Sequence, residues 1–170
     1  MYKSLPCEAI FYFGIFTAED AEIAETEEKD RLDRITDSII GAAIKVHRAL
    51  GPGLLESAYE ACLAFELIEL GLKIERQKPV PVVYREVKLE CGYRADIIVE
   101  EAVVIEMKVV EHLAPIHKAQ LLSYLKLTGC KVGLLINFNV KVLTAGIVRM
   151  VNNYPDALRS QRPLRLEEQD

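Results

Sequence analysis

The sequence predicts an α+β domain, a mixed β-sheet flanked by helices. Its 170 residues suffice for one domain with a buried core. Apolar residues recur at helical spacing early in the chain, at strand spacing in the middle, and at helical spacing once more before the last strands. This order, α, α, β, β, β, α, β, β, favours a mixed α/β arrangement over a doubly wound parallel sheet.

The charge distribution suggests three parts to the chain. Residues 1–30 carry eight acidic and two basic side chains, which accounts for the net charge of −5. We expect this segment to be an acidic extension, either a solvated helix or a disordered lead-in. Residues 31–154 form the predicted domain, and 155–170 a polar tail. The near-neutral domain excludes a broad basic surface for nucleic acid, but it leaves room for a local basic groove.

Three helices are expected from apolar positions spaced three or four apart. The first covers residues 31–50 and ends at the Gly51-Pro52-Gly53 break. The second covers residues 54–70 and ends at Gly71. The third covers residues 114–129, with a proline in its first turn and a glycine at its end.

Strands are expected in the remaining apolar segments. Residues 79–90 suggest one strand and a bend, and residues 91–100 and 102–110 form two strands joined by a turn at Glu100 and Glu101. Residues 131–138 and 143–151 are expected to add two more strands.

Several classes of protein are disfavoured by composition. There is no long uncharged apolar run to span a membrane. The apolar stretch 9–16 is short for a signal peptide and lacks a convincing cleavage site, so a cytoplasmic location is expected. The four cysteines form no CxxC pair and have no zinc-ligand spacing, which is typical of free thiols in a reducing compartment.

Charged residues interrupt the most apolar pair of strands. Glu106 and Lys108 are two residues apart and therefore share one face of a strand. An antiparallel pairing would bring Asp96 beside Glu106. Two adjacent carboxylates suit a hard divalent cation such as Mg²⁺ or Mn²⁺, and Lys108 could orient a water or stabilise developing negative charge. The alternative is a surface ladder in which Lys108 simply pairs with Glu106.

Two helices supply further candidates for the same site. Glu56 falls in the first turn of the second helix, where the helix dipole favours a carboxylate even without a functional role. Gln120 and Tyr124 are four apart on the third helix and so lie on one face. That pair is equally consistent with the polar edge of an amphipathic helix.

The combination of these motifs resembles a known family. Asp96 followed by Glu106-Met107-Lys108, in an αβββαβ core, resembles the PD-(D/E)XK nuclease superfamily, whose fold is restriction-endonuclease-like. The segment "GLLESAY", residues 53–59, resembles the motif that names the GxxExxY protein family within it. The resemblance covers about residues 33–152; "RAD" stands where the superfamily pattern has Pro-Asp.

The resemblance implies roles for individual residues. Asp96, Glu106 and the backbone carbonyl of Met107 would bind Mg²⁺ or Mn²⁺, and Lys108 would be the catalytic lysine. Glu56, Gln120 and Tyr124 would complete the site. The implied activity is cleavage of phosphodiester bonds in DNA, with RNA as a second substrate class. Two alternatives stay open: a catalytically silent binding or regulatory module, and a phosphoesterase for small nucleotides. The oligomeric state, monomer or homodimer, also stays open.

Overall fold

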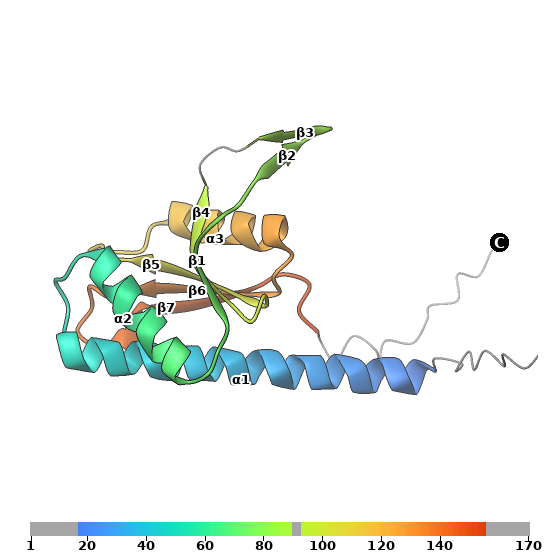
Figure 1. Ribbon diagram of the computed structural model, residues 1–170, viewed down its shortest axis with the longest axis horizontal. Helices are drawn as coiled ribbons and strands as arrows, with labels where there is room; N and C mark the ends of the chain where they lie inside the picture. The colour runs from blue at the N-terminus through green and yellow to red at the C-terminus, as the bar shows by residue number, and fades with distance from the viewer. Residues whose placement is uncertain (1–16, 90–92, 156–170) are drawn as a thin grey trace, which may run out of the picture.

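The chain forms three layers, with a five-stranded sheet between helices. The structure is a computed structural model and describes residues 17–89 and 93–155. Helices α1 (Ala18–Leu50) and α2 (Glu56–Glu69) cover one face of the sheet, and α3 (Pro115–Thr128) covers the other (Figure 1). The expected α+β class, a mixed sheet flanked by helices, is therefore confirmed.

The central sheet has the strand order β1-β4-β5-β6-β7. Its strands are β1 (Ile74–Pro79), β4 (Arg94–Val99), β5 (Val103–Lys108), β6 (Val132–Asn137) and β7 (Ile147–Val151). Only the β5–β6 pair is parallel, and α3 makes the crossover between these two strands. The other pairs are antiparallel, and β4 and β5 are joined by a tight turn.

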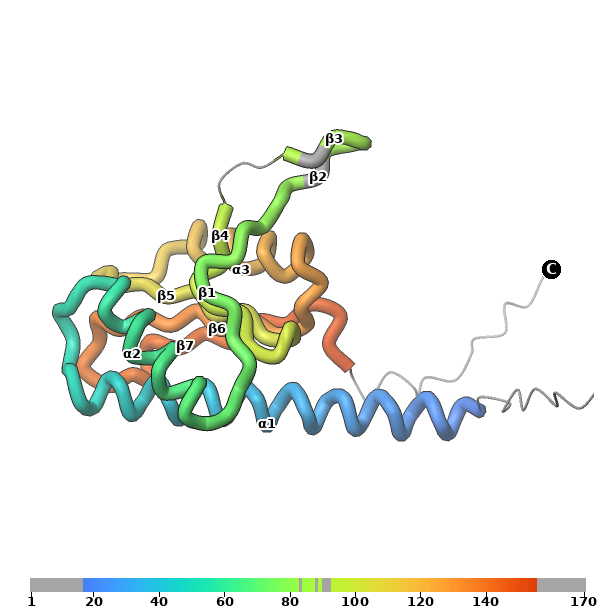
Figure 2. The backbone as a smooth tube through the Cα atoms, in the orientation of Figure 1, coloured from blue at the N-terminus to red at the C-terminus, as the bar shows by residue number. Residues whose placement is uncertain are grey.

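A separate hairpin interrupts this sheet in sequence. Strands β2 (Val82–Tyr84) and β3 (Val87–Leu89) pair only with each other. The hairpin projects from the end of β1 and stands clear of the sheet above α3 (Figure 2). The strand and bend expected over residues 79–90 were thus assigned only in part, because the chain leaves the sheet after Pro79 and forms a small sheet of its own.

Strand β1 was missed because its sequence, "IERQKP", has no alternation of apolar residues. It lies at the edge of the sheet and is largely exposed, so no buried face imposes that alternation. The strand expected over 143–151 begins only at Ile147, since Leu143–Gly146 form a 3₁₀ turn.

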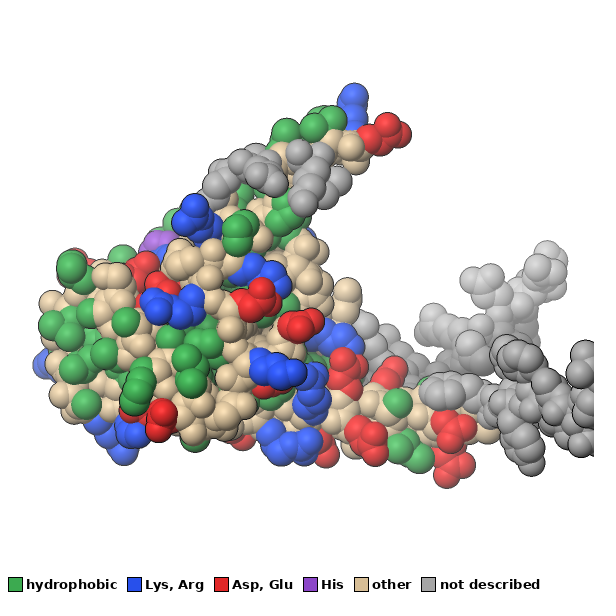
Figure 3. All heavy atoms as spheres, in the orientation of Figure 1, with side chains coloured by type: hydrophobic (Ala, Val, Ile, Leu, Met, Phe, Trp, Pro, Cys, Tyr) green, Lys and Arg blue, Asp and Glu red, His purple; other side chains and the backbone are tan. Residues whose placement is uncertain are grey.

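Helix α1 crosses the boundary expected at residue 30. It starts at Ala18 behind the capping residue Thr17, whose hydroxyl accepts from the Asp20 amide at 3.2 Å. The first three turns are mostly exposed and acidic (Figure 3), so of the two forms expected for this stretch, residues 18–30 adopt the solvated helix. Residues 1–16 and 156–170, including the apolar stretch 9–16 and most of the expected tail, lie outside the described residues.

Two apolar cores separate the layers. The larger lies between the sheet and helices α1 and α2, and the smaller lies between the sheet and α3. Gly133 of β6 allows α3 to approach the sheet closely, because a Cβ there would lie 2.9 Å from Cγ of Leu121. Across the part of the chain that the structure describes, none of the helices combines the length and the apolar character that crossing a membrane requires.

Candidate active site

Asp96 and Glu106 meet where strands β4 and β5 stop pairing. The ladder between these strands ends at the Ile97–Ile105 pair. Beyond it, the Asp96 carboxylate accepts a hydrogen bond from the Met107 amide at 2.8 Å, in place of a backbone partner. Met107 points its side chain into the larger core, away from the site. The period of two along β5 thus sends Met107 inward and its neighbours Glu106 and Lys108 to the opposite face.

Glu106 is buried, and one of its oxygens lacks a hydrogen-bond partner among the described residues. The side chain is 3 % exposed, and Oε2 makes no hydrogen bond to residues 17–89 or 93–155. Burial and the nearby Asp96 charge raise the pKa of Glu106 to about 7, against the opposing effect of Lys108. Burial also raises the pKa of Asp96. Burying a carboxylate oxygen without a hydrogen-bond donor costs free energy. Such an oxygen therefore indicates a site that binds a ligand.

Lys108 lies beside Glu106 and is also largely buried. Its ammonium donates to Oε1 of Glu106 at 2.6 Å, and its side chain is 15 % exposed. Burial disfavours the ammonium, but the carboxylates of Glu106, Glu56 and Asp96 outweigh it and raise the pKa of Lys108. The pair is therefore not the exposed salt-bridge ladder considered as the alternative.

Glu56 reaches the same group from the start of α2. It interacts electrostatically with Lys108 and Asp96, and the backbone amide of Val109 lies nearby. Burial is the main cause of its raised pKa. Tyr59, one turn later, is fully buried and donates to the Gly51 carbonyl at 2.6 Å. This bond fixes the loop that leads into α2, and with it the position of Glu56.

Gln120 and Tyr124 approach from α3. The Gln120 amide donates to the Tyr124 hydroxyl at 2.8 Å, as their four-residue spacing predicts. The carboxylates of Glu106 and Asp96 contribute to the raised pKa of Tyr124, after its burial, which places the hydroxyl within electrostatic reach of both. The structure thus brings all the candidates named from the sequence to one end of the sheet.

Two residues of this site, Glu60 and Gln77, were not predicted from the sequence. Glu60 on α2 is buried, and its carboxylate accepts from Gln77 at 2.8 Å and from Arg76 at 2.9 Å. The same Gln77 amide lies 3.4 Å from the Asp96 carboxylate. Gln77 has a φ of 49°, in the left-handed region, where few residues other than glycine settle without cost. Nothing in the local sequence signals this conformation or this contact.

The donor atoms suit a divalent cation. Within residues 17–89 and 93–155, no three side chains of His, Cys, Asp or Glu converge to hold one ion. Mg²⁺, however, typically takes one or two carboxylates and completes its shell with water and phosphate oxygens. The unpartnered Oε2 of Glu106 and the adjacent Asp96 carboxylate provide such a pair. The side chains present therefore fit this kind of ion.

Comparison with known proteins supports the same interpretation. A family profile described as the PD-(D/E)XK nuclease superfamily matches residues 33–150. The matched segment contains every candidate residue and leaves out the first half of α1. No curated protein and no solved structure matches the chain.

Proposed function

The chain belongs to the PD-(D/E)XK nuclease superfamily, and we therefore propose that it is a Mg²⁺- or Mn²⁺-dependent nuclease that cleaves phosphodiester bonds in DNA. Membership in the superfamily implies a nucleic acid substrate and, in general, a divalent metal ion. The proposal goes beyond superfamily membership in three points: DNA as the substrate, Mg²⁺ as the ion, and kinship with the GxxExxY family.

The observation that carries the proposal is the unpartnered oxygen of Glu106. A buried carboxylate pair with a free oxygen is costly in a protein that only needs to fold. It is useful in a protein that binds a cation there, because the ion supplies the missing partner. The Asp96 carboxylate, held by the Met107 amide, would bind the same ion, together with the Met107 carbonyl.

The remaining residues have roles that their positions support. A bound divalent ion would supply Lewis-acid stabilisation of the phosphate and lower the pKa of a bound water. Lys108 would place its ammonium beside the scissile phosphate and stabilise the negative charge that develops there. Glu56 would orient the attacking water, and the Gln120–Tyr124 pair would position the nucleic acid from α3.

The second candidate function is a catalytically silent module that binds nucleic acid with the same fold. Its support is the near-neutral net charge of residues 31–154, which gives no broad positive field to attract phosphates. The convergence of all the candidate residues around the buried Glu106 supports the nuclease more strongly, since a module that only binds nucleic acid gains nothing from a buried carboxylate oxygen without a hydrogen-bond partner. The cytoplasmic location stays a prediction from the sequence, and the choice between monomer and homodimer stays open.

A direct test is cleavage by the purified full chain. We expect linear DNA to be degraded with Mg²⁺ or Mn²⁺ and left intact with EDTA. A circular plasmid substrate separates internal cuts from digestion at ends, and an RNA of the same sequence tests the substrate class. Binding of DNA with no cleavage in either metal would reject the nuclease and favour the silent module.

A further inference from the structure

An apolar groove lies beside the candidate site, between the β2–β3 hairpin and α3. Its volume is about 620 Å³, and its walls include Val82, Tyr93, Ile116, Gln120, Tyr124 and Leu127. We call it the hairpin–α3 groove. Two of its wall residues, Gln120 and Tyr124, also belong to the candidate active site, so the groove leads directly to it.

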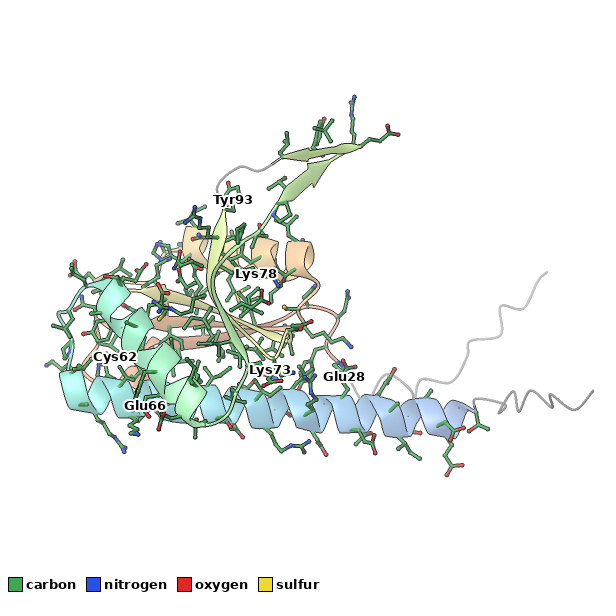
Figure 4. The ribbon with its side chains drawn as sticks, in the orientation of Figure 1. Glu28, Cys62, Glu66, Lys73, Lys78 and Tyr93 are labelled. Atoms are coloured by element: carbon green, nitrogen blue, oxygen red, sulfur yellow. The ribbon has the colours of Figure 1, made fainter. Side chains whose placement is uncertain are left out.

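Tyr93 gives the groove an aromatic wall. It lies at the base of the hairpin, beside α3 (Figure 4), and is 50 % exposed. Its ring meets the ring of Tyr124 edge to face, with centroids 6.4 Å apart and planes at 73°. An edge-to-face pair covers at most one face of each ring, so Tyr124 leaves at least one face of the half-exposed Tyr93 ring free.

The chemistry of the walls favours bases over phosphates. Lys126 is the one basic side chain among the described residues that line the groove, and no carboxylate is among them. Duplex DNA hides its bases and is bound through many phosphate contacts, which one lysine cannot supply. Unpaired bases expose apolar faces that stack on aromatic side chains whatever their sequence.

We propose that the hairpin–α3 groove binds unpaired bases, so that this protein takes single-stranded nucleic acid, or a single-stranded end, into its active site. Cleavage of the bound strand rests on the proposed nuclease function. Binding of the strand in the groove does not depend on that function. A base stacked on Tyr93 would place the adjoining backbone near Tyr124 and hence near Glu106 and Lys108.

The test measures binding without cleavage. Fluorescence anisotropy of labelled oligonucleotides, in EDTA, gives the Kd of the full chain for a DNA single strand, for the same strand without bases, and for a blunt duplex. We expect the single strand to bind more tightly than both. Tyr93→Ala should weaken single-strand binding about fivefold or more, the loss of one stacked base, and Tyr93→Phe should retain it.

A matched control comes from the hairpin itself. Tyr84 is also exposed, at 62 %, but lies outside the groove walls. Tyr84→Ala should therefore leave the Kd unchanged. An RNA single strand tests which sugar is accepted. Tyr93 is exposed, so its truncation leaves the core intact; circular dichroism checks that each variant is folded.

The outcomes separate this inference from the proposed function. Equal affinity of wild type and Tyr93→Ala for the single strand, or tighter binding of the duplex, overturns the groove as a base-binding site even if the protein cleaves DNA. Tyr93-dependent binding in a protein that never cleaves would retain the groove and reject the nuclease.

Discussion

Two clusters of charged side chains in this molecule differ in how completely their polar atoms find hydrogen-bond or ion-pair partners. In the site cluster, Asp96, Glu106 and Lys108 are largely buried, and burial raises the pKa of both carboxyls. An oxygen of Glu106 there has no hydrogen-bond partner in the part of the chain that the structure describes. In the second cluster, the Asp33 carboxylate on α1 bonds to Lys29, Arg149 and Tyr154.

The second cluster has the opposite electrostatic character. Its side chains are partly exposed, and the hydrogen bond from Tyr154, with help from Lys29 and Arg149, lowers the pKa of Asp33. Similar residue types therefore form stabilising ion pairs around Asp33 and an electrostatically strained cluster around Glu106. The difference identifies function better than residue identity does, because only the strained cluster gains from a ligand.

The largest expected effect separates the two lysines. Lys108→Ala should lower metal-dependent DNA cleavage about a hundredfold or more, the usual cost of losing a group that stabilises transition-state charge. Lys29→Ala removes a lysine from the second cluster and should leave cleavage unchanged. Initial rates on linear DNA, with the melting temperature of each variant as a folding check, decide the matter. Equal rates for wild type and Lys108→Ala would make Lys108 a structural residue.

The next effect concerns metal binding. If an ion binds Asp96 and Glu106, Mg²⁺ or Mn²⁺ at a hundred times its Kd should stabilise the fold by about 2.7 kcal/mol, visible as a higher melting temperature. Asp96→Asn should abolish this rise, and Asp33→Asn should keep it. A rise that survives in Asp96→Asn would place the ion elsewhere.

A smaller effect is expected from Gln77, which bridges Glu60 and Asp96. Gln77→Gly keeps the left-handed backbone at no strain but removes the amide, so metal affinity should fall about tenfold, as for other residues that hold a ligand in place. Arg85→Gly is the control, since Arg85 has a φ of 54° but lies in the β2–β3 turn. Titration by isothermal calorimetry compares them; unchanged affinity in Gln77→Gly would show that Asp96 is held without it.

The smallest effect is that of Asp33 on stability. Because the pKa of Asp33 is lower in the folded state, the unfolded chain takes up the proton first as pH falls. The stabilisation is therefore present at neutral pH and is lost as pH falls through the lowered pKa. Asp33→Asn should cost at most about 1 kcal/mol at neutral pH, and urea denaturation should show this difference shrinking toward about pH 3. A difference in unfolding free energy between wild type and Asp33→Asn that does not change with pH would contradict this role of Asp33.

Apolar patterns predicted most of the fold because most elements bury one or both faces. Helix α2 and strands β5 and β6 follow their apolar patterns, whereas the exposed edge strand β1 has none. The alternation of side chains along β5 likewise placed Glu106 and Lys108 on one face. The contact between Glu60 and Gln77 depends on how α2 packs across β1 and on one unusual φ angle, and neither is encoded in a local pattern.

The absence of a side chain at Gly133 sets the clearance between α3 and the sheet. Adding even one methyl group there would push against Leu121 and lift the helix. That helix carries Gln120 and Tyr124, so the lift would widen the mouth of the site and move its polar wall away from the carboxylates. One backbone position that carries no functional group thus limits the width of the nucleic acid strand that the site can admit.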